Sequence, residues 1–268
     1  MEYHNHEKEH DTMLKYSPAN AKTVALKEVE ELQPFLENKR RIYSLDLLSG
    51  YSCPFAEKCL SRAIVLPNGK RKIIDGRKTE FRCFSASQEV QYTNVFNLRQ
   101  HNFNTLRGLH LNDMIHELNQ AMPENLGICR IHVAGDFFNR NYMFAWINMA
   151  MMHPDRLFYA YTKSLKYWLQ NMEWVEKLDN FILTASYGGR DDDLIFKHGL
   201  RHCNVIGSET ETNLPIDHDD SHAARPSQRH NSFSLLIHGT QPKGSKAAEA
   251  LKLLKGKGSY SRLKPTTN

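Results

Sequence analysis

Residues 44–59 read Ser44-Leu-Asp-Leu-Leu-Ser-Gly-Tyr-Ser-Cys-Pro-Phe-Ala-Glu-Lys-Cys59. The apolar run that precedes Ser49-Gly50 predicts a β-strand, and the Ser-Gly pair predicts the turn that ends it. Cys53 and Cys59 then fall in a polar loop with a proline, where a buried filler residue is not expected. A third cysteine follows in Phe81-Arg-Cys-Phe-Ser-Ala86, directly before a helical pattern. Three cysteines gathered at a strand end predict a metal or cluster site.

The three thiols of Cys53, Cys59 and Cys83 do not decide which metal is bound. Thiolates suit both zinc and iron–sulfur clusters, and three of them would leave a [4Fe–4S] cluster with one iron free for another ligand. A closed zinc site needs a fourth ligand, which Cys129, Cys203 or a histidine could supply. The cysteine spacing matches neither a zinc ribbon nor the ferredoxin runs. We expect an iron–sulfur cluster, with zinc as the alternative and simple buried cysteines as the plain interpretation.

Length and composition suit one α/β domain. The chain has 268 residues, 40% hydrophobic and 24% charged, and no stretch approaches the roughly 18 apolar residues of a membrane span. The amino terminus lacks the apolar core of a secretory signal, and five cysteines are an odd number, which favours a reducing cytoplasm. We expect a flexible lead over 1–20, one domain over 21–260 that includes a cysteine loop over 49–86, and a flexible tail over 261–268.

The charge leaves a nucleic-acid partner open without requiring one. The net charge of +5 is modest, and basic residues are spread along the chain with a mild concentration over 243–264. No dense Arg/Lys block and no aromatic–basic repeat stands out. The acidic run over 216–222 could hold a divalent cation, although a solvated loop is the commoner outcome. Oligomeric state is not indicated.

Strand and helix patterns alternate along most of the chain. A helical region is expected over 21–36, and a small hairpin around Pro67-Asn-Gly69 is expected between the second and third cysteines. Further strands are predicted over 130–138, 157–163, 180–186, 203–207 and 234–238, separated by helices over 142–152, 166–178 and 191–198, with a last helix over 245–254. Such alternation predicts parallel βαβ units. About six strands indicate an open, partial parallel β/α barrel, with a doubly wound sheet as the alternative.

Polar residues follow the predicted strands, where chemistry gathers in parallel α/β folds. Gly135 would let a ligand approach the backbone, while Asp136 could accept an amine or cap the next helix. Lys163 could bind a carboxylate or phosphate, or form a plain salt bridge, and His238 could be a ligand, a proton carrier or a core histidine. We predict catalytic roles for Asp136, Lys163 and His238, and cofactor binding by Gly135, Asp136, Ser186 and Glu209.

Several motifs together resemble the phage and prophage family called gene product 88, over about residues 44–260. They are the two cysteine stretches quoted above, His132-Val-Ala-Gly-Asp-Phe-Phe138, Phe158-Tyr-Ala-Tyr-Thr-Lys-Ser164 and Ile237-His-Gly-Thr-Gln-Pro242. More distantly, the layout is similar to radical S-adenosylmethionine enzymes, which carry three cluster cysteines after the first barrel strand and a glycine-rich acidic turn after the second. A phage-encoded chain would work in the host cytoplasm.

The second resemblance implies roles for particular residues. Cys53, Cys59 and Cys83 would bind the cluster, and Gly135-Asp136 would contact the amine of S-adenosylmethionine. The usual enzymes hold their cysteines in one compact loop, whereas Cys83 lies far downstream, so binding of S-adenosylmethionine stays open. The chain is then a radical or redox enzyme, or, alternatively, a metal-stabilised binding protein of a mobile element that contacts nucleic acid or a protein partner.

Overall fold

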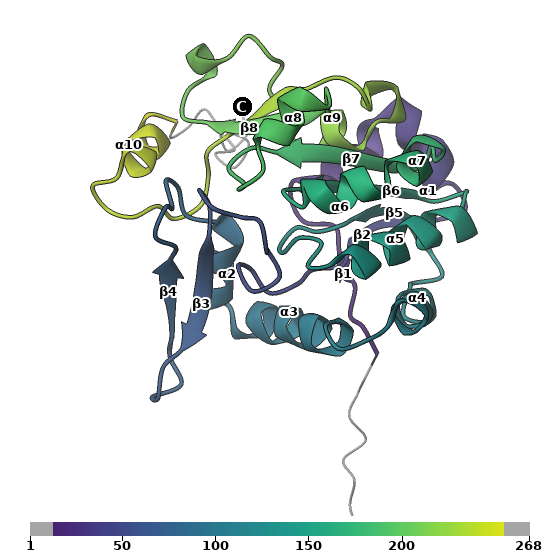
Figure 1. Cartoon of the computed structure of the whole chain (residues 1–268), viewed down its shortest axis with the longest axis horizontal. Coiled ribbons are helices and arrows are strands. Elements are labelled where there is room, and N and C mark those ends of the chain that lie inside the picture. Colours follow the sequence, from purple (N-terminus) through teal and green to yellow (C-terminus); the bar gives the residue numbers. More distant parts are fainter. Residues whose placement is uncertain (1–12, 255–268) are drawn as a thin grey trace, which may run out of the picture.

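The computed structural model of the chain describes residues 13–254, and most of its strands form a single sheet (Figure 1). The seven strands lie in the order β1-β2-β5-β6-β7-β8-β9. Their bounds are β1 Ser17–Pro18, β2 Arg41–Ser44, β5 Leu126–Arg130, β6 Leu157–Thr162, β7 Phe181–Ser186, β8 His202–Ile206 and β9 Phe233–Leu236. All neighbours run parallel except β1 and β2. The six parallel strands are the number that the sequence predicts.

The strand order decides between the two predicted architectures. From β2 to β9 each new strand joins the same growing edge, so the order along the chain is the order in the sheet. A doubly wound sheet would reverse direction at a switch point, whereas continued winding with right-handed crossovers is how a β/α barrel grows. The sheet therefore curls into a half-barrel, which confirms the open barrel and excludes the doubly wound alternative.

The two faces of the sheet are covered by different parts of the chain. The crossover helices α4 Leu111–Gln120, α5 Arg140–Met152, α6 Leu165–Gln170 and α7 Met172–Glu176 pack on one face, where they bury Phe158, Leu183 and their neighbours. The other face buries Tyr159 and Ile182 under the amino-terminal turns and the short α9 Ser221–Ala224. Alternate residues of one strand thus enter opposite cores, which is the period of two that marks a sheet buried on both sides.

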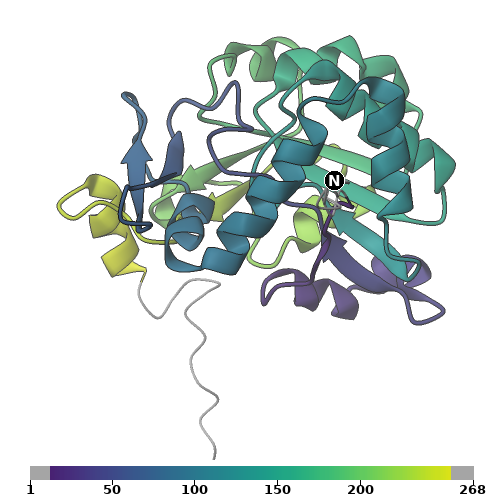
Figure 2. The same cartoon turned by 90° about the horizontal axis from the view of Figure 1, so that it is seen from below.

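A separate hairpin stands beside the sheet (Figures 1 and 2). It consists of β3 Ser61–Val65 and β4 Arg71–Asp75, which pair antiparallel, and Gly69 in its tip has a φ of +77°, where a side chain would be strained. The hairpin packs on α2 Phe84–Gln91 and, through Ala63 and Phe96, on α3 Thr93–Leu106. The predicted hairpin insertion is confirmed.

Two predicted elements differ from the structure. The helix expected over 21–36 is broken into 3₁₀ turns at Thr23–Glu28 and Glu30–Leu32 and a short α1 Gln33–Leu36. The strand expected over 130–138 is β5, which ends at Arg130, because the following residues turn toward β2 and reach Gly135 with a φ of +99°. The expected lead over 1–20 contains β1, while residues 1–12 and the tail over 261–268 lie outside the described part.

The region after β8 supplies the remaining short elements. They are η3 Glu209–Glu211, α9, η4 Pro226–Gln228 and, after β9, α10 Lys246–Leu253, with α8 Asp193–Lys197 before β8. Within residues 13–254, every helix is too short or too polar to span a bilayer.

Candidate functional site

The loop that carries Cys53 and Cys59 is fastened to the connection that follows β7. The amides of Glu57 and Lys58 both donate to the carbonyl of Gly188, at 3.0 and 2.9 Å, and the amide of Arg190 donates to the carbonyl of Phe55 at 2.9 Å. A Cβ on Gly188 would lie 3.2 Å from the Cβ of Lys58. Glycine at this position therefore allows the cysteine loop to lie against the carboxyl end of β7.

The segment that carries Cys83 is fastened to the end of β9. The side chain of Gln241 pairs with both backbone groups of Arg82: its Oε1 accepts from the amide at 2.7 Å and its Nε2 donates to the carbonyl at 3.1 Å. The next residue but one, Phe84, packs edge-on against the imidazole of His238, with 4.6 Å between ring centroids. Two motifs that are about 160 residues apart thus fix the third cysteine at the first turn of α2.

The three thiols lie within electrostatic range of one another, and each is half-buried. Burial raises the pKa of Cys53, and negative charge on Asp136, Cys83 or Cys59 raises it further. Burial likewise raises the pKa of Cys83 to about 11, with Cys59 as the largest charge effect. The sheet core fully buries Cys129 on one face and Cys203 on the other. The fold therefore places the three cysteines that the sequence singles out close enough for their charges to affect one another.

A single metal ion has no ready site in this arrangement. Among residues 13–254, no three His, Cys, Asp or Glu side chains lie close enough together to hold one ion. A zinc ion would need its ligands within roughly 2.0–2.3 Å. The cation site considered for the acidic run over 216–222 is likewise not formed, because Asp217 and Asp220 are buried and engaged by protein groups.

Asp136 ties the end of β5 to the end of β6. Its Oδ1 accepts from the hydroxyl of Thr162 at 2.6 Å and from the amide of Phe137, and its Oδ2 accepts from the amide of Lys163 at 2.8 Å. Burial nevertheless raises the pKa of this carboxyl. At Gly135 an added Cβ would lie 2.7 Å from both Leu47 Cβ and Ser52 Oγ. The space beside this glycine is thus occupied by the start of the cysteine loop.

Lys163 extends from the end of β6 to the end of β7. Its ammonium group donates to the hydroxyl of Ser186 at 2.7 Å and to the carbonyl of the same residue at 3.2 Å. Burial lowers the pKa of this lysine, but negative charge on Cys59, Cys203 and Asp136 outweighs burial, so the pKa is raised. A buried ammonium therefore lies close to the cysteine loop, and the salt bridge considered for Lys163 and Asp136 is replaced by a backbone hydrogen bond.

The other residues predicted for the site, His238, Glu209 and Ser186, differ in burial. Burial, with the charges of Lys22 and Arg130, lowers the pKa of His238 to about 4, so the imidazole is neutral at pH 7. Glu209 is exposed in the first turn of η3, after β8. Ser186 is brought to Lys163, as described above. The rim thus gathers the cysteines with Asp136, Lys163 and Ser186, whereas Glu209 lies on the surface.

A buried ionic cluster beneath the cysteine loop escaped the sequence reasoning. Glu89 Oε1 accepts from the amide of Ser49 at 3.0 Å, from its hydroxyl at 2.6 Å and from Arg99 Nη1 at 3.2 Å. Arg99 also donates to the carbonyl of Ser85 at 3.1 Å. The cluster anchors the first turn of the loop to α2 and α3. No local signal marks it, because Glu89 and Arg99 sit in helices that read as ordinary polar surface.

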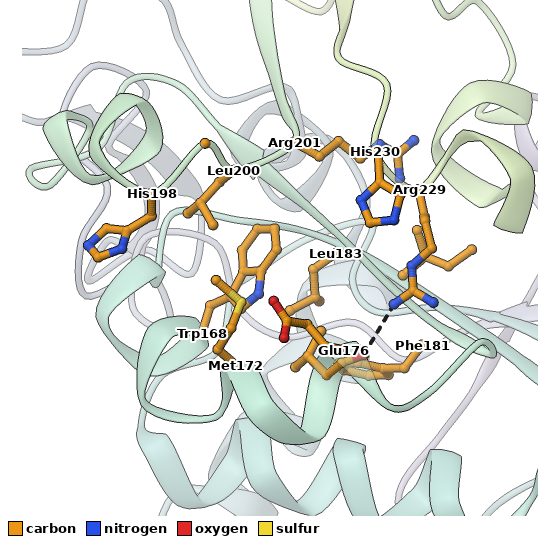
Figure 3. A pocket seen from close by; sticks show the side chains of 13 residues that line it. Trp168, Met172, Glu176, Phe181, Leu183, His198, Leu200, Arg201, Arg229 and His230 are labelled. Carbon is orange, nitrogen blue, oxygen red and sulfur yellow. Dashed lines mark hydrogen bonds between the residues drawn. The ribbon is translucent and has the colours of Figure 1, made fainter.

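A pocket of about 120 Å³ lies beside the first residue of β7 and the residues that precede β8 (Figure 3). Trp168, Met172 and Phe181 form its apolar wall, and Arg229 crosses it to donate to the carbonyl of Val175 at 3.2 Å. The pocket borders the first residue of β7, so it belongs to the amino ends of the strands, which in barrel folds serve stability more than chemistry. The predicted site residues all lie away from this pocket.

Comparisons with known proteins place these observations in a family. A curated relative, the Gene 88 protein of Mycobacterium phage L5, is 31% identical over 90 residues, which make up 30% of this chain and 38% of that protein. No solved structure matches the chain. The sequence model of the family described as Gene product 88 matches residues 13–255, nearly the whole chain. The chain therefore belongs to the gene product 88 family of phage proteins.

Proposed function

We propose that this chain binds an iron–sulfur cluster through Cys53, Cys59 and Cys83 at the carboxyl rim of the half-barrel. The observation that carries the proposal is the approach of three half-buried thiols from two distant segments, each segment fastened by its own backbone hydrogen bonds. Cysteines that served only as buried core residues would not need these hydrogen bonds to hold them in place. Two further cysteines, Cys129 and Cys203, lie in the sheet core and serve as an internal contrast.

The number of thiols favours a cluster over a single zinc ion, because a closed zinc site needs four ligands. Each cysteine of a [4Fe–4S] cluster binds a different iron, so the ligands lie further apart than those of zinc. Three thiols in electrostatic range of one another suit the larger group. Three cysteine ligands would leave one iron open to a small molecule or a protein group. Free thiols and such a cluster both suit the reducing cytoplasm of a host cell.

The groups around the thiols suit redox or radical chemistry. Lys163 brings a buried positive charge beside Cys59, which would favour an anionic cluster and a reduced state. In the described part of the chain, Asp136 Oδ2 accepts one hydrogen bond, so it keeps capacity for one further donor such as an amine. We therefore propose a radical S-adenosylmethionine-like or redox enzyme, in which Asp136 and Lys163 position the substrate.

The first experiment is anaerobic purification followed by iron and sulfide analysis. We expect about four irons per chain and a broad absorbance near roughly 400 nm. Cys53→Ser, Cys59→Ser and Cys83→Ser should each lose the cluster. Cys129→Ala and Cys203→Ala should keep it, and alanine is used there to avoid a buried hydroxyl. Stoichiometric zinc, or iron retained in the three serine variants, would overturn the proposal.

The second experiment separates an enzyme from a cluster-stabilised scaffold. Reduced protein is titrated with S-adenosylmethionine and followed by electron paramagnetic resonance, with assay for 5′-deoxyadenosine. A changed cluster signal and formation of 5′-deoxyadenosine support the radical enzyme. An unchanged signal without this product removes the radical chemistry and leaves a cluster that holds the cysteine loop in place, or a redox centre without the cofactor.

A further inference from the structure

Positive charge is concentrated in the hairpin and the two helices that follow it. Residues 61–112 contain nine Lys and Arg but three Asp and Glu, a net charge of +6 against +5 for the whole chain. The three acids are already engaged: Asp75 with Arg82 at 2.6 Å, Glu80 with Lys58 at 3.0 Å and Glu89 with Arg99. Two more of the basic side chains are also engaged: Lys78 pairs with Glu57 at 2.7 Å, and Arg71 donates to the carbonyl of Glu89 at 2.8 Å.

Four of these cations are exposed around the hairpin and the end of α3: Arg62, Lys70, Lys72 and Arg107. Within the described residues, none of the four has a carboxylate at salt-bridge distance. Pairing of Arg62 with Ile74 and of Ile64 with Lys72 puts Arg62 and Lys72 on the same outward face of the hairpin. The opposite face, which includes Ala63, packs against α2 and α3.

A groove of about 290 Å³ runs between the hairpin and α3, and we call it the hairpin groove. Its lining includes Tyr51, Val65, Phe96, Phe103, Gln100 and Arg107. Tyr51 is 41% exposed although it is aromatic, and the guanidinium of Arg62 lies over its ring at 5.4 Å. Arg107 lies over Phe103 in the same way, at 5.8 Å. The groove thus combines aromatic rings with guanidinium groups that have no carboxylate partner among the described residues.

We propose that the hairpin groove binds single-stranded nucleic acid. A base would stack on Tyr51, the amide side chain of Gln100 would face its polar edge, and Arg62, which reaches Tyr51, and Arg107, which lines the groove, would contact the phosphates. A duplex keeps its bases stacked and offers none to the ring. An acidic peptide would match the cations but would leave the exposed aromatic face without a planar partner. Stacking surface and charge together therefore favour a single strand.

This site is distinct from the cluster but shares its loop. Tyr51 lies two residues before Cys53, and Ser61 in β3 accepts a weak hydrogen bond from the amide of Cys83 at 3.4 Å. A strand bound in the hairpin groove would therefore pass beside the cysteines. The groove is formed by protein side chains alone, so binding of nucleic acid does not depend on the proposed cluster.

The test is fluorescence anisotropy with a labelled mixed-sequence oligonucleotide, as single-stranded DNA, single-stranded RNA and duplex DNA. We expect a single strand to bind more tightly than the duplex, and the two single-stranded arms identify the sugar that is preferred. Arg62→Ala/Arg107→Ala should weaken binding and reduce the salt slope by about 1.4, the value for two phosphate contacts on a single strand. The matched control, Lys27→Ala/Lys197→Ala, removes two exposed charges elsewhere and should keep the slope.

A second variant tests stacking separately from charge. Tyr51→Ala should weaken binding about tenfold, whereas Tyr51→Phe keeps the ring and should bind as the natural protein does. Circular dichroism confirms that each variant is folded. Equal weakening by the control pair, equal binding of duplex and single strand, equal loss with Tyr51→Phe and Tyr51→Ala, or equal competition by polyglutamate would each overturn the proposal, as would absence of binding at low salt.

Discussion

The cluster around Asp220 and the cysteine rim are both groups of ionisable side chains, and they are built in opposite ways. Around Asp220 every oxygen is matched: Lys22 at 2.7 Å and Tyr161 contact Oδ1, while Arg130 at 2.5 Å and Tyr159 contact Oδ2. Burial alone would raise the pKa of this carboxyl, but Arg130 and Lys22 hold it well below the usual range. The Asp220 cluster therefore stays ionised and joins the amino-terminal segment, the sheet and α9.

The cysteine rim has the reverse character. Its segments are fixed by backbone contacts and by Gln241, whereas burial raises the pKa of the Cys53 and Cys83 thiols instead of matching them with cations. A cluster whose charges are satisfied inside the protein contributes stability. Thiols that are held in position without a cation beside them can still bind a metal group from outside the protein. The comparison predicts that changes near Asp220 affect folding and that changes at the rim affect ligand content.

The largest expected effect is on folding, at Asp220. Asp220→Asn removes the charge but keeps the shape, and asparagine tolerates the φ of +64° found here. Arg130 and Lys22 would lose their buried counter-charge, so the free energy of unfolding should fall by about 3 kcal/mol or more. Urea unfolding followed by tryptophan fluorescence measures this. Glu173→Gln, which breaks the exposed pair with Lys177, should leave stability unchanged, and equal losses in the two variants would contradict the comparison.

The next effect is a pH dependence at His238, which lies between the two clusters. Its pKa is about 4 in the folded chain and roughly 6.5 when unfolded. As pH falls below about 6.5, the unfolded chain takes up a proton that the folded chain refuses, so stability decreases until about pH 4. The loss is at most about 3 kcal/mol, reduced by the partial exposure of the ring.

His238→Gln isolates this contribution. The variant should lose stability more slowly than the natural protein between pH 6.5 and pH 4.5, because glutamine does not titrate. His198→Gln replaces an exposed imidazole in the same way and should keep the natural pH dependence. Parallel stability curves for the natural protein and His238→Gln would show that the imidazole is protonated in the folded state as well.

Much of the fold is encoded locally and could be predicted from the sequence. The runs that became β6 and β7 are apolar throughout, as strands buried on both faces must be, and short helices separate them. The ordering of strands follows from right-handed crossovers. The continuous helix expected over 21–36 is not found, because Pro34 removes a backbone donor and begins the short α1 instead of continuing a helix.

Less of the site could be predicted, because its contacts join distant segments. The Cys83 segment is held by the pairing of Gln241 with Arg82 and by the amides of Glu80 and Phe81, which donate to the carbonyl of Lys58, and no local pattern reveals these contacts. The run over 216–222 reads as a solvated acidic loop, yet Asp220 is fully buried because Arg130 and Lys22 come from elsewhere in the chain. Gly135 was expected to make room for a ligand, whereas Leu47 and Ser52 fill that space.

Gln241→Ala carries the smallest expected loss of stability. It tests whether the cysteine rim, at the carboxyl end of the sheet, responds separately from the amino end. Gln241→Ala leaves the amide and carbonyl of Arg82 and the carbonyl of His238 without their partner, and should cost about 1–2 kcal/mol. Asn180→Ala is the matched control, because Asn180 is a buried amide that donates to three carbonyls beside the amino end of β7.

Both variants should lose similar stability, but iron content should fall only with Gln241→Ala, since only this change removes a contact of the segment that carries Cys83. Iron per chain, measured anaerobically alongside urea unfolding, separates the two effects. If both variants keep the iron content of the natural protein, Gln241 supports folding alone. Equal iron loss would mean that the rim responds to global stability and is not set apart from the rest of the half-barrel.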